Sequence, residues 1–167
     1  NDNVDTSLGS LVLFSSRRQM EEVAAGLKDN LKDILLIQGE QSKRIILESH
    51  KDAIDGDKGS LLFGLASFAE GVDLPGKYLT RVYIAKIPFA VPDDPVEATL
   101  AEWIQRRGGN PFMEITIPDA SLRLVQATGR LLRSETDSGE IHILDKRLHT
   151  KRYGRQLINS LPPYKQI

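Results

Sequence analysis

The sequence predicts an α/β fold, an open and mainly parallel sheet with helices on both faces. Short, continuous apolar runs alternate along the 167 residues with longer segments that show helical periodicity. The connections between these runs are long enough for right-handed crossovers. Ligands of such sheets bind at the carboxyl ends of the strands. We therefore expect the two segments of chemical interest described below to lie at that edge.

In the first half of the chain, two predicted helices separate three apolar runs. The runs are typical of strands buried on both faces and cover residues 11–14, 34–37 and 61–65. The helical periodicity covers residues 19–27 and 41–54. Ser15 and Ser16 are N-cap candidates for the first of these helices. The turn-rich segment DGDKG precedes the third strand.

The second half of the chain predicts two further strands and three helices. The strands cover residues 82–87 and 141–144, and the helices cover residues 95–106, 122–133 and about 151–159. Asp119 follows Pro118 and can cap the second of these helices. Trp103 lies beside Leu100 and Ile104 on one helix, which favours a core position over a contact with DNA.

The composition is that of a globular domain and excludes several classes of site. Hydrophobic residues make up 40% of the chain, and 22 basic residues balance 23 acidic ones, so any anion site must come from local clustering. The absence of cysteine excludes a disulfide scaffold, a zinc knuckle and a cysteine-held iron–sulfur cluster within this chain. The three histidines are too scattered to predict a metal site.

The length predicts one domain over residues 1–167, with residues 1–9 as a flexible lead-in. The apolar runs are too short to span a bilayer, and no signal peptide is recognised. The first residue is asparagine, which is expected of a piece of a longer protein. Processing would explain it equally well.

One helix carries a stripe of arginines without a nearby carboxylate in its run. On a helical wheel Arg123, Gln126, Arg130 and Arg133 fall within a stripe about 80° wide. Leu124, Val125, Leu131 and Leu132 lie on the opposite side, and Gly129 lies at the edge of the stripe. Guanidinium groups suit phosphate oxygens. A solvated face, or pairing with carboxylates elsewhere in the fold, is the structural alternative.

The segment QATGRLLR, residues 126–133, matches the Q-x-x-G-R-x-x-R pattern of motif VI in superfamily 2 helicases. A second segment, SFAEGVD at residues 67–73, resembles motif V of the DinG/XPD branch of that superfamily. Without the other motifs, this second segment would be interpreted as an ordinary turn at the end of a strand. The segment KIPFAVPDDP at 86–95 is similar to another motif of the branch, and LVLFSSRR at 11–18 resembles motif IV. The resemblance covers residues from about 10 to 155.

The resemblance implies the second motor domain of a DinG-type ATP-dependent DNA helicase, with a RecA-like fold that lacks its own phosphate loop. Arg130 and Arg133 would act as arginine fingers on ATP held by the first motor domain, with Gln126 positioning the γ-phosphate or the attacking water. Glu70, Gly71, Asp73 and Gly129 would sense the nucleotide and couple it to DNA.

No phosphate loop and no acidic magnesium motif occurs in the sequence, so ATP and Mg²⁺ would bind mainly to the absent first domain. Many members carry a 4Fe–4S cluster there, and some carry a nuclease domain instead. The isolated domain is expected to be inactive. The resemblance further implies a monomeric, cytoplasmic bacterial protein, nucleoid-associated when working. It would move 5′ to 3′ on single-stranded or forked DNA in DNA repair, with no membrane partner.

The expected DNA contacts are Ser15, Ser16, Arg17, Ser67 and Phe68. The first three would sit at a helix N-terminus, and Ser67 and Phe68 could meet the backbone or stack under a base. Burial of Phe68 in the core and simple solvation of Arg17 are the alternatives. A different function class also remains open: a RecA-like docking module without a catalytic half, in which the arginines hold a structural anion or the carboxylates of a partner.

Overall fold

The computed structural model describes residues 6–90, 94–131 and 137–165. The chain divides into two compact units, and each is described by itself. The first contains Asn1–Lys86 and Ala127–Leu144, and the second contains Ile87–Gln126 and Asp145–Ile167. The chain leaves the first unit after the fourth strand, returns to supply the fifth strand, and leaves again.

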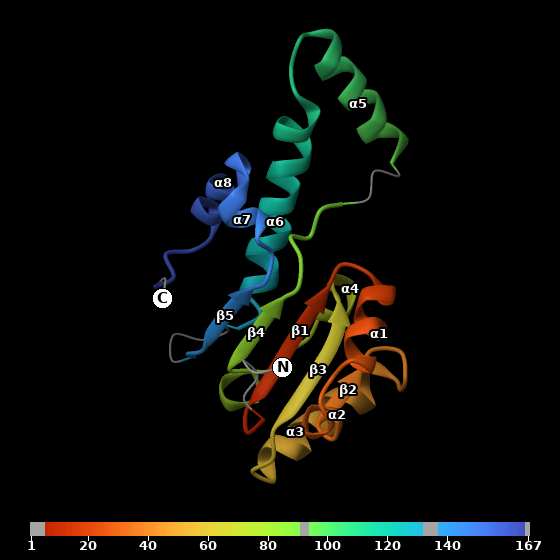
Figure 1. The fold of residues 1–167 in the computed structure, drawn as a ribbon, viewed down its shortest axis with the longest axis vertical. Helices are drawn as coiled ribbons and strands as arrows, with labels where there is room; N and C mark the ends of the chain where they lie inside the picture. Colours follow the sequence, from red (N-terminus) through yellow and green to blue (C-terminus); the bar gives the residue numbers. More distant parts are fainter. Residues whose placement is uncertain (1–5, 91–93, 132–136, 166–167) are drawn as a thin grey trace. The chain divides into compact units, whose positions relative to one another are not determined.

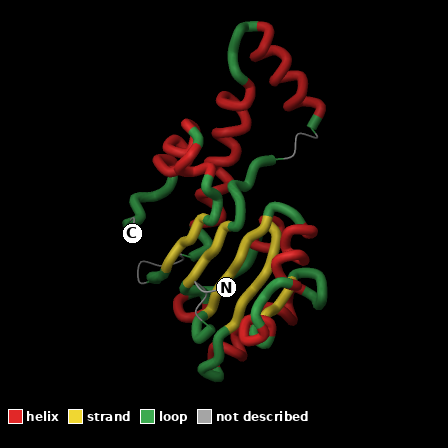
Figure 2. Tube along the Cα trace, viewed as in Figure 1, coloured by secondary structure: helices red, strands yellow, loops and turns green. Residues whose placement is uncertain are grey.

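The first unit is a five-stranded parallel sheet with the strand order β2-β3-β1-β4-β5 (Figures 1 and 2). Its strands are β1 (Gly9–Phe14), β2 (Leu35–Ile37), β3 (Ser60–Leu65), β4 (Arg81–Ile84) and β5 (Glu140–Ile143). Its helical elements are α1 (Arg17–Ala25), α2 (Asp29–Lys32), α3 (Lys43–Asp55), α4 (Ala66–Ala69) and the 3₁₀ turn η1 (Gly76–Tyr78). Every pairing is parallel, as predicted.

Strand β1 occupies the centre of the sheet and sets its register. Leu11 pairs with Leu62 of β3 on one side and with Val82 of β4 on the other. All three residues are almost fully buried, which explains why these strands read as continuous apolar runs. Because the strands are parallel, the loops that follow β1, β2 and β3 all emerge at one edge of the sheet.

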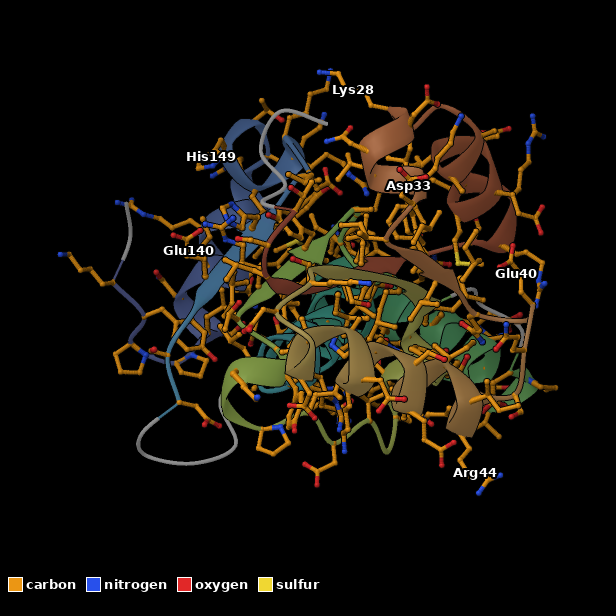
Figure 3. The ribbon with its side chains drawn as sticks, turned by 90° about the horizontal axis from the view of Figure 1, so that it is seen from below. Lys28, Asp33, Glu40, Arg44, Glu140 and His149 are labelled. Carbon is orange, nitrogen blue, oxygen red and sulfur yellow. The ribbon has the colours of Figure 1, made fainter. Side chains whose placement is uncertain are left out.

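Helices cover both faces of this sheet, as the sequence predicted. On one face Met20 of α1 and Leu31 of α2 pack against Val12, Phe14 and Phe63, in a cluster that contains an edge-to-face pair of Phe14 and Phe63 with ring centroids 4.8 Å apart. Helix α3 lies on the other face. Figure 3 shows the two sides: Lys28 lies with α1 and α2, and Arg44 lies with α3.

Most boundaries lie within two residues of the prediction, and the differences have local causes. Ser16 caps α1, since its Oγ accepts from the Gln19 N–H at 3.3 Å, so the helix begins at Arg17. Strand β4 ends at Ile84, three residues before the predicted end. Two residues of the predicted lead-in pair with the sheet: the Leu8 carbonyl accepts from the Ser60 N–H at 3.2 Å, and β1 begins at Gly9. The four-residue helices α2 and α4 are too short to show a periodicity.

A buried histidine joins α3, β3 and η1. His50 is 0% exposed, with Nδ1 2.8 Å from Ser60 Oγ and Nε2 2.6 Å from the Tyr78 carbonyl oxygen. A carbonyl only accepts, so Nε2 carries the proton, and Nδ1 accepts from the Ser60 hydroxyl. Burial lowers the pKa of His50, because the charged form loses its hydration. The neutral ring is therefore part of the folded structure.

This arrangement predicts a loss of stability in mild acid. The unfolded chain, with an ordinary histidine pKa of about 6.5, takes up a proton that folded His50 resists, so the free energy of unfolding falls below about pH 6.5. Urea unfolding at pH 7, 6 and 5 measures this slope. His50→Gln should flatten it, whereas His149→Gln, an exposed histidine of the second unit, should leave it unchanged. A wild-type slope in His50→Gln would contradict the assignment.

The second unit is helical in the described ranges. It contains α5 (Pro95–Arg106), the π-helical segment η2 (Phe112–Thr116), most of α6 (Ile117–Thr128), α7 (Arg147–Thr150) and α8 (Arg152–Ser160). Helix α5 has the predicted bounds and is capped by Asp94, whose Oδ1 accepts from the Val96 N–H at 2.8 Å. Along the described parts of the chain, no helix is both long and apolar enough to cross a membrane.

The predicted core position of Trp103 is wrong. The side chain is 52% exposed, and the Arg107 guanidinium lies 4.5 Å from its ring centroid. Ile104 is the buried residue of this helix, at 6% exposure. The helical pattern predicted the apolar face of α5 correctly. Leu100 and Trp103, however, lie on a part of that face that is exposed to solvent in this chain.

A buried carboxylate organises the end of the second unit. Asp145 is 8% exposed and accepts from the Ile87 N–H at 3.0 Å and from the Arg147 guanidinium, whose Nη2 lies 2.6 Å from Oδ2. These donors, led by Arg147, lower the pKa of Asp145 to about 2. The Arg147 guanidinium also lies 5.1 Å from the centroid of the Phe89 ring. Asp145 therefore joins two distant segments of this unit.

Candidate functional site

The loops after β1 and β2 bring an arginine against a glycine backbone. Ser15, Ser16 and Arg17 follow β1 directly and are exposed, as the DNA-contact prediction requires. The Arg17 guanidinium lies over Gly39, where an added Cβ would come within 3.1 Å of Nη1. Its nearest carboxylate, Glu21, is 4.0 Å away and 61% exposed. Such a distant and solvated pair leaves most of the arginine's hydrogen-bonding capacity available.

A shallow pocket opens beside this arginine, at the carboxyl ends of β2 and β3. It has a volume of about 260 Å³ and is lined by Gln38, Gly39, Gln41, Lys43, Ile46, Ser67 and Phe68. Gln38 Oε1 accepts from the Leu65 N–H at 2.7 Å and so ties the two strand ends together. Ser67 is exposed at the pocket and offers a hydroxyl. Positive charge, hydroxyls and amides here form a surface suited to phosphate.

Phe68 cannot serve as a base-stacking residue in this structure. The side chain is 3% exposed and packs on Gly64, where an added Cβ would approach the ring to 2.5 Å. The alternative reading, burial in the core, is therefore the correct one. Its sequence neighbour Ser67 is exposed because the short helix α4 turns one side chain outward and the next inward.

Lys43 is a residue of this edge that the sequence patterns did not predict. Its ammonium group donates to the Glu70 carbonyl and lies 5.3 Å from the Phe68 ring centroid. The signal was available: Lys43 opens the helix that follows the second strand, so the parallel topology places it at the carboxyl edge. Helical periodicity alone does not distinguish Lys43 from the other polar residues of this helix.

Glu70, Gly71 and Asp73 form an exposed connection after α4. Gly71 has φ 69°, in the left-handed region that glycine tolerates, and Val72 and Leu74 on either side of Asp73 are buried. Asp73 is therefore turned outward between two buried neighbours. Within the described ranges, neither the Glu70 nor the Asp73 carboxylate has an ion-pair partner.

The arginine segment differs from the predicted continuous helix. Helix α6 begins at Ile117, five residues early, and ends at Thr128, so Arg130 lies in a turn that follows it. Asp119 does not cap the helix. It lies in the first turn and accepts from Arg123 Nε at 2.7 Å, so this arginine is paired, as one alternative reading proposed.

Arg130 keeps the properties expected of an anion ligand. It is partly exposed, it follows the exposed Gly129, and in the described part of the chain no carboxylate pairs with it. Leu131, directly after it, is 2% exposed and anchors the turn. Gln126 is exposed near the end of α6. Arg133 and Leu132 lie outside the described residues.

The structure does not bring Arg130 to the carboxyl edge with the other predicted site residues. Leu131 Cδ1 would lie 2.8 Å from a Cβ at Gly139, the residue before β5. The turn therefore adjoins the amino end of β5, because helix α6 precedes that strand directly. The expectation that both segments occupy the carboxyl edge holds for Glu70 and Gly71 and is wrong for Arg130.

No set of three or more histidine and acidic side chains in the described ranges could hold a metal ion. A bound Mg²⁺–nucleotide would need such carboxylates and a phosphate loop, and the sequence contains no phosphate loop. What Arg130 offers is a positive charge beside the exposed backbone of Gly129.

Comparisons with known proteins identify the family of the chain. The family described as helicase C-terminal domain matches residues 4–164. The chain is 51% identical over 161 residues to the ATP-dependent DNA helicase DinG of Photobacterium profundum, covering 95% of this chain and 23% of that protein. It is 43% identical to the protein of the same name from Escherichia coli (strain K12), covering 94% of this chain and 22% of that protein.

A solved structure described as XPD_APO shows the same fold. It has a TM-score of 0.71 at 23% identity and covers 97% of this chain and 33% of its own. The predicted RecA-like fold is thus confirmed, while this chain spans only about a quarter of the length of its curated relatives. By the match over residues 4–164, the chain belongs to the helicase C-terminal domain family, in which its curated relatives are DinG-type helicases.

Proposed function

We propose that this chain is the second motor domain of an ATP-dependent DNA helicase and supplies arginine fingers to a nucleotide held by the first. The observation that carries the proposal is Arg130: a partly exposed guanidinium without a carboxylate partner in the described ranges, in a turn anchored by buried Leu131. Several solvated arginines of the chain do pair with a carboxylate of their own helix, as Arg123 does with Asp119.

The proposed chemistry of this domain is charge stabilisation. Arg130, together with Arg133, would donate to the oxygens of the γ-phosphoryl group as negative charge spreads over them. Gln126 would position that group or the attacking water, and the absent first domain would hold ATP and Mg²⁺. Gly129 carries no side chain, so a phosphate could approach the backbone beside Arg130 closely.

The carboxyl edge of the sheet would bind single-stranded DNA. Arg17 and the hydroxyls of Ser15, Ser16 and Ser67 are exposed there, beside the pocket that Lys43 lines. Contacts of this kind recognise the phosphate backbone rather than the base sequence. Glu70, Gly71 and Asp73 would couple the nucleotide to this edge, and cleft closure and opening would step the domain 5′ to 3′ along the strand.

The finger assignment predicts a large loss of ATP turnover in the full-length protein. Arg130→Ala should lower the DNA-stimulated rate by about 10³-fold or more, and Arg133→Ala by a similar factor, because an arginine finger stabilises transition-state charge. Arg123→Ala is the matched control, since it removes a paired arginine from α6, the helix that precedes Arg130, and should change the rate by less than about twofold. Near-wild-type rates for both finger variants would contradict the proposal.

The 167-residue chain by itself should hydrolyse no ATP, because the phosphate loop and the magnesium carboxylates are absent from its sequence. A phosphate-release assay with and without single-stranded DNA tests this, with the full-length protein as positive control. Turnover by a preparation free of other ATPases, and removed by Arg130→Ala, would show that the chain holds a complete site.

Loss of one phosphate contact at the carboxyl edge should weaken DNA binding in a salt-dependent way. For Arg17→Ala in the full-length protein we expect affinity for single-stranded DNA to fall several-fold and the slope of log K against log salt to decrease by about 0.7. Arg18→Ala is the control, because Arg18 pairs with Glu22 at 2.7 Å and is 88% exposed. Equal effects of the two variants in fluorescence anisotropy titrations would argue against a specific contact.

A further inference from the structure

Residues 69–72 form a type II β-turn at the carboxyl edge of the sheet. The Val72 N–H donates to the Ala69 carbonyl at 3.1 Å, which closes the four-residue turn. Glu70 has φ −60° and ψ 124°, and Gly71 has φ 69°, close to the values of the two central residues of a type II turn. The peptide between Glu70 and Gly71 is the one whose orientation distinguishes type II from type I.

Both ends of this turn are fixed in the core. Ala69 is 4% exposed and Val72 is 2% exposed, whereas Glu70 and Gly71 are exposed. The central peptide can therefore rotate between the two turn types while its flanking residues stay in place. Some other interaction must select the orientation, since glycine at the third position permits type II but does not require it.

Lys43 supplies that interaction from another element. Its ammonium group donates to the Glu70 carbonyl, and a Cβ at Gly71 would lie 4.0 Å from its Nζ. The lysine is itself well placed, because Ser42 caps α3 by accepting from the Ile45 N–H and the Phe68 ring lies under the ammonium group at 5.3 Å. Ile46, one turn further along α3, is 2% exposed and anchors the helix.

When Lys43 holds the Glu70 carbonyl, the direction of the Gly71 N–H in the same peptide is fixed as well. In a trans peptide the Glu70 C=O and the Gly71 N–H point in opposite directions. In the described part of the chain, the Gly71 N–H donates no hydrogen bond, and the residue is exposed. With the carbonyl directed at Lys43, this N–H is presented to the solvent side of the turn as a free donor.

We infer that Lys43 is a positioning residue that holds the Glu70–Gly71 peptide so that the Gly71 N–H can donate to a phosphoryl oxygen. The inference rests on the proposed function, in which this turn lies between nucleotide and DNA, and it adds the residue that sets the turn. Rotation of the peptide to type I would aim the Glu70 carbonyl where the amide now points. A carbonyl repels the phosphoryl oxygen that the amide attracts.

The turn type can be measured without any activity. In ¹H–¹⁵N spectra of the 167-residue chain, a type II turn gives a strong nuclear Overhauser effect between Glu70 Hα and the Gly71 amide proton, and a type I turn gives one between the two amide protons. Lys43→Met keeps the apolar stem over Phe68 and removes the donor, so the first signal should weaken and the second should appear. Lys43→Arg should retain the wild-type pattern.

Lys51→Met is the matched control, because Lys51 also extends from α3 over an aromatic ring, with Nζ 5.6 Å from the Tyr78 centroid. It should leave the turn unchanged. In the full-length protein Lys43→Met should lower kcat/KM for ATP at saturating DNA by about tenfold if the phosphoryl oxygen belongs to the nucleotide. If it belongs to DNA, the half-saturating DNA concentration should rise by a similar factor with kcat unchanged.

The outcomes separate this inference from the proposed function. A Lys43→Met protein whose turn signals and kinetic constants match those of Lys51→Met would overturn the role of Lys43, even if Arg130→Ala is inactive. A wild-type full-length protein without DNA-stimulated ATP turnover would overturn the proposed function instead. Recovery of both the turn signal and the kinetic constants in Lys43→Arg, with neither recovered in Lys43→Met, supports positioning by the cation.

Discussion

The parallel pairing of β1 between β3 and β4 is the constraint on which the rest of the first unit depends. Leu11, Leu62 and Val82 share one level of the sheet and are nearly fully buried, so the register cannot slip without exposing them. This pairing sends the loops after β1, β2 and β3 to one edge. Residues from three distant parts of the sequence, Arg17, Gly39 and Ser67, thereby line one surface.

The chemistry of that surface depends on backbone groups as much as on side chains. The Arg17 guanidinium lies on the bare backbone of Gly39, and the Lys43 ammonium group holds the Glu70 carbonyl. Both arrangements place cations and amides at the edge while the apolar parts of the same loops stay in the core. Arg130 belongs to a different place, a turn beside the amino end of β5, so phosphate chemistry would occur at two separated positions of this unit.

Much of the fold could be predicted because its signals are local. Continuous apolar runs predicted all five strands, the predicted cap Ser16 lies just before α1, and helix α5 has the predicted bounds. The positions of two aromatic side chains could not be predicted from such local signals. Phe68 is buried because Gly64 leaves room for its ring, and Trp103 is open because nothing in the described chain covers that side of α5. The burial of Phe68 and the exposure of Trp103 both depend on contacts with particular neighbouring residues, which hydrophobic periodicity does not encode.

The sequence by itself determined the strands, the helical segments, the family and the residue types available for phosphate. These follow from hydrophobic spacing and from short motifs, which act over a few residues. Only the tertiary structure decided that Arg123 pairs with Asp119, that Arg130 has no carboxylate partner within the described ranges, that α6 stops before Gly129, and that Lys43 meets the Glu70 carbonyl. The reason is that burial and hydrogen bonding are set by neighbours in space, and 27 residues separate Lys43 from Glu70 along the chain.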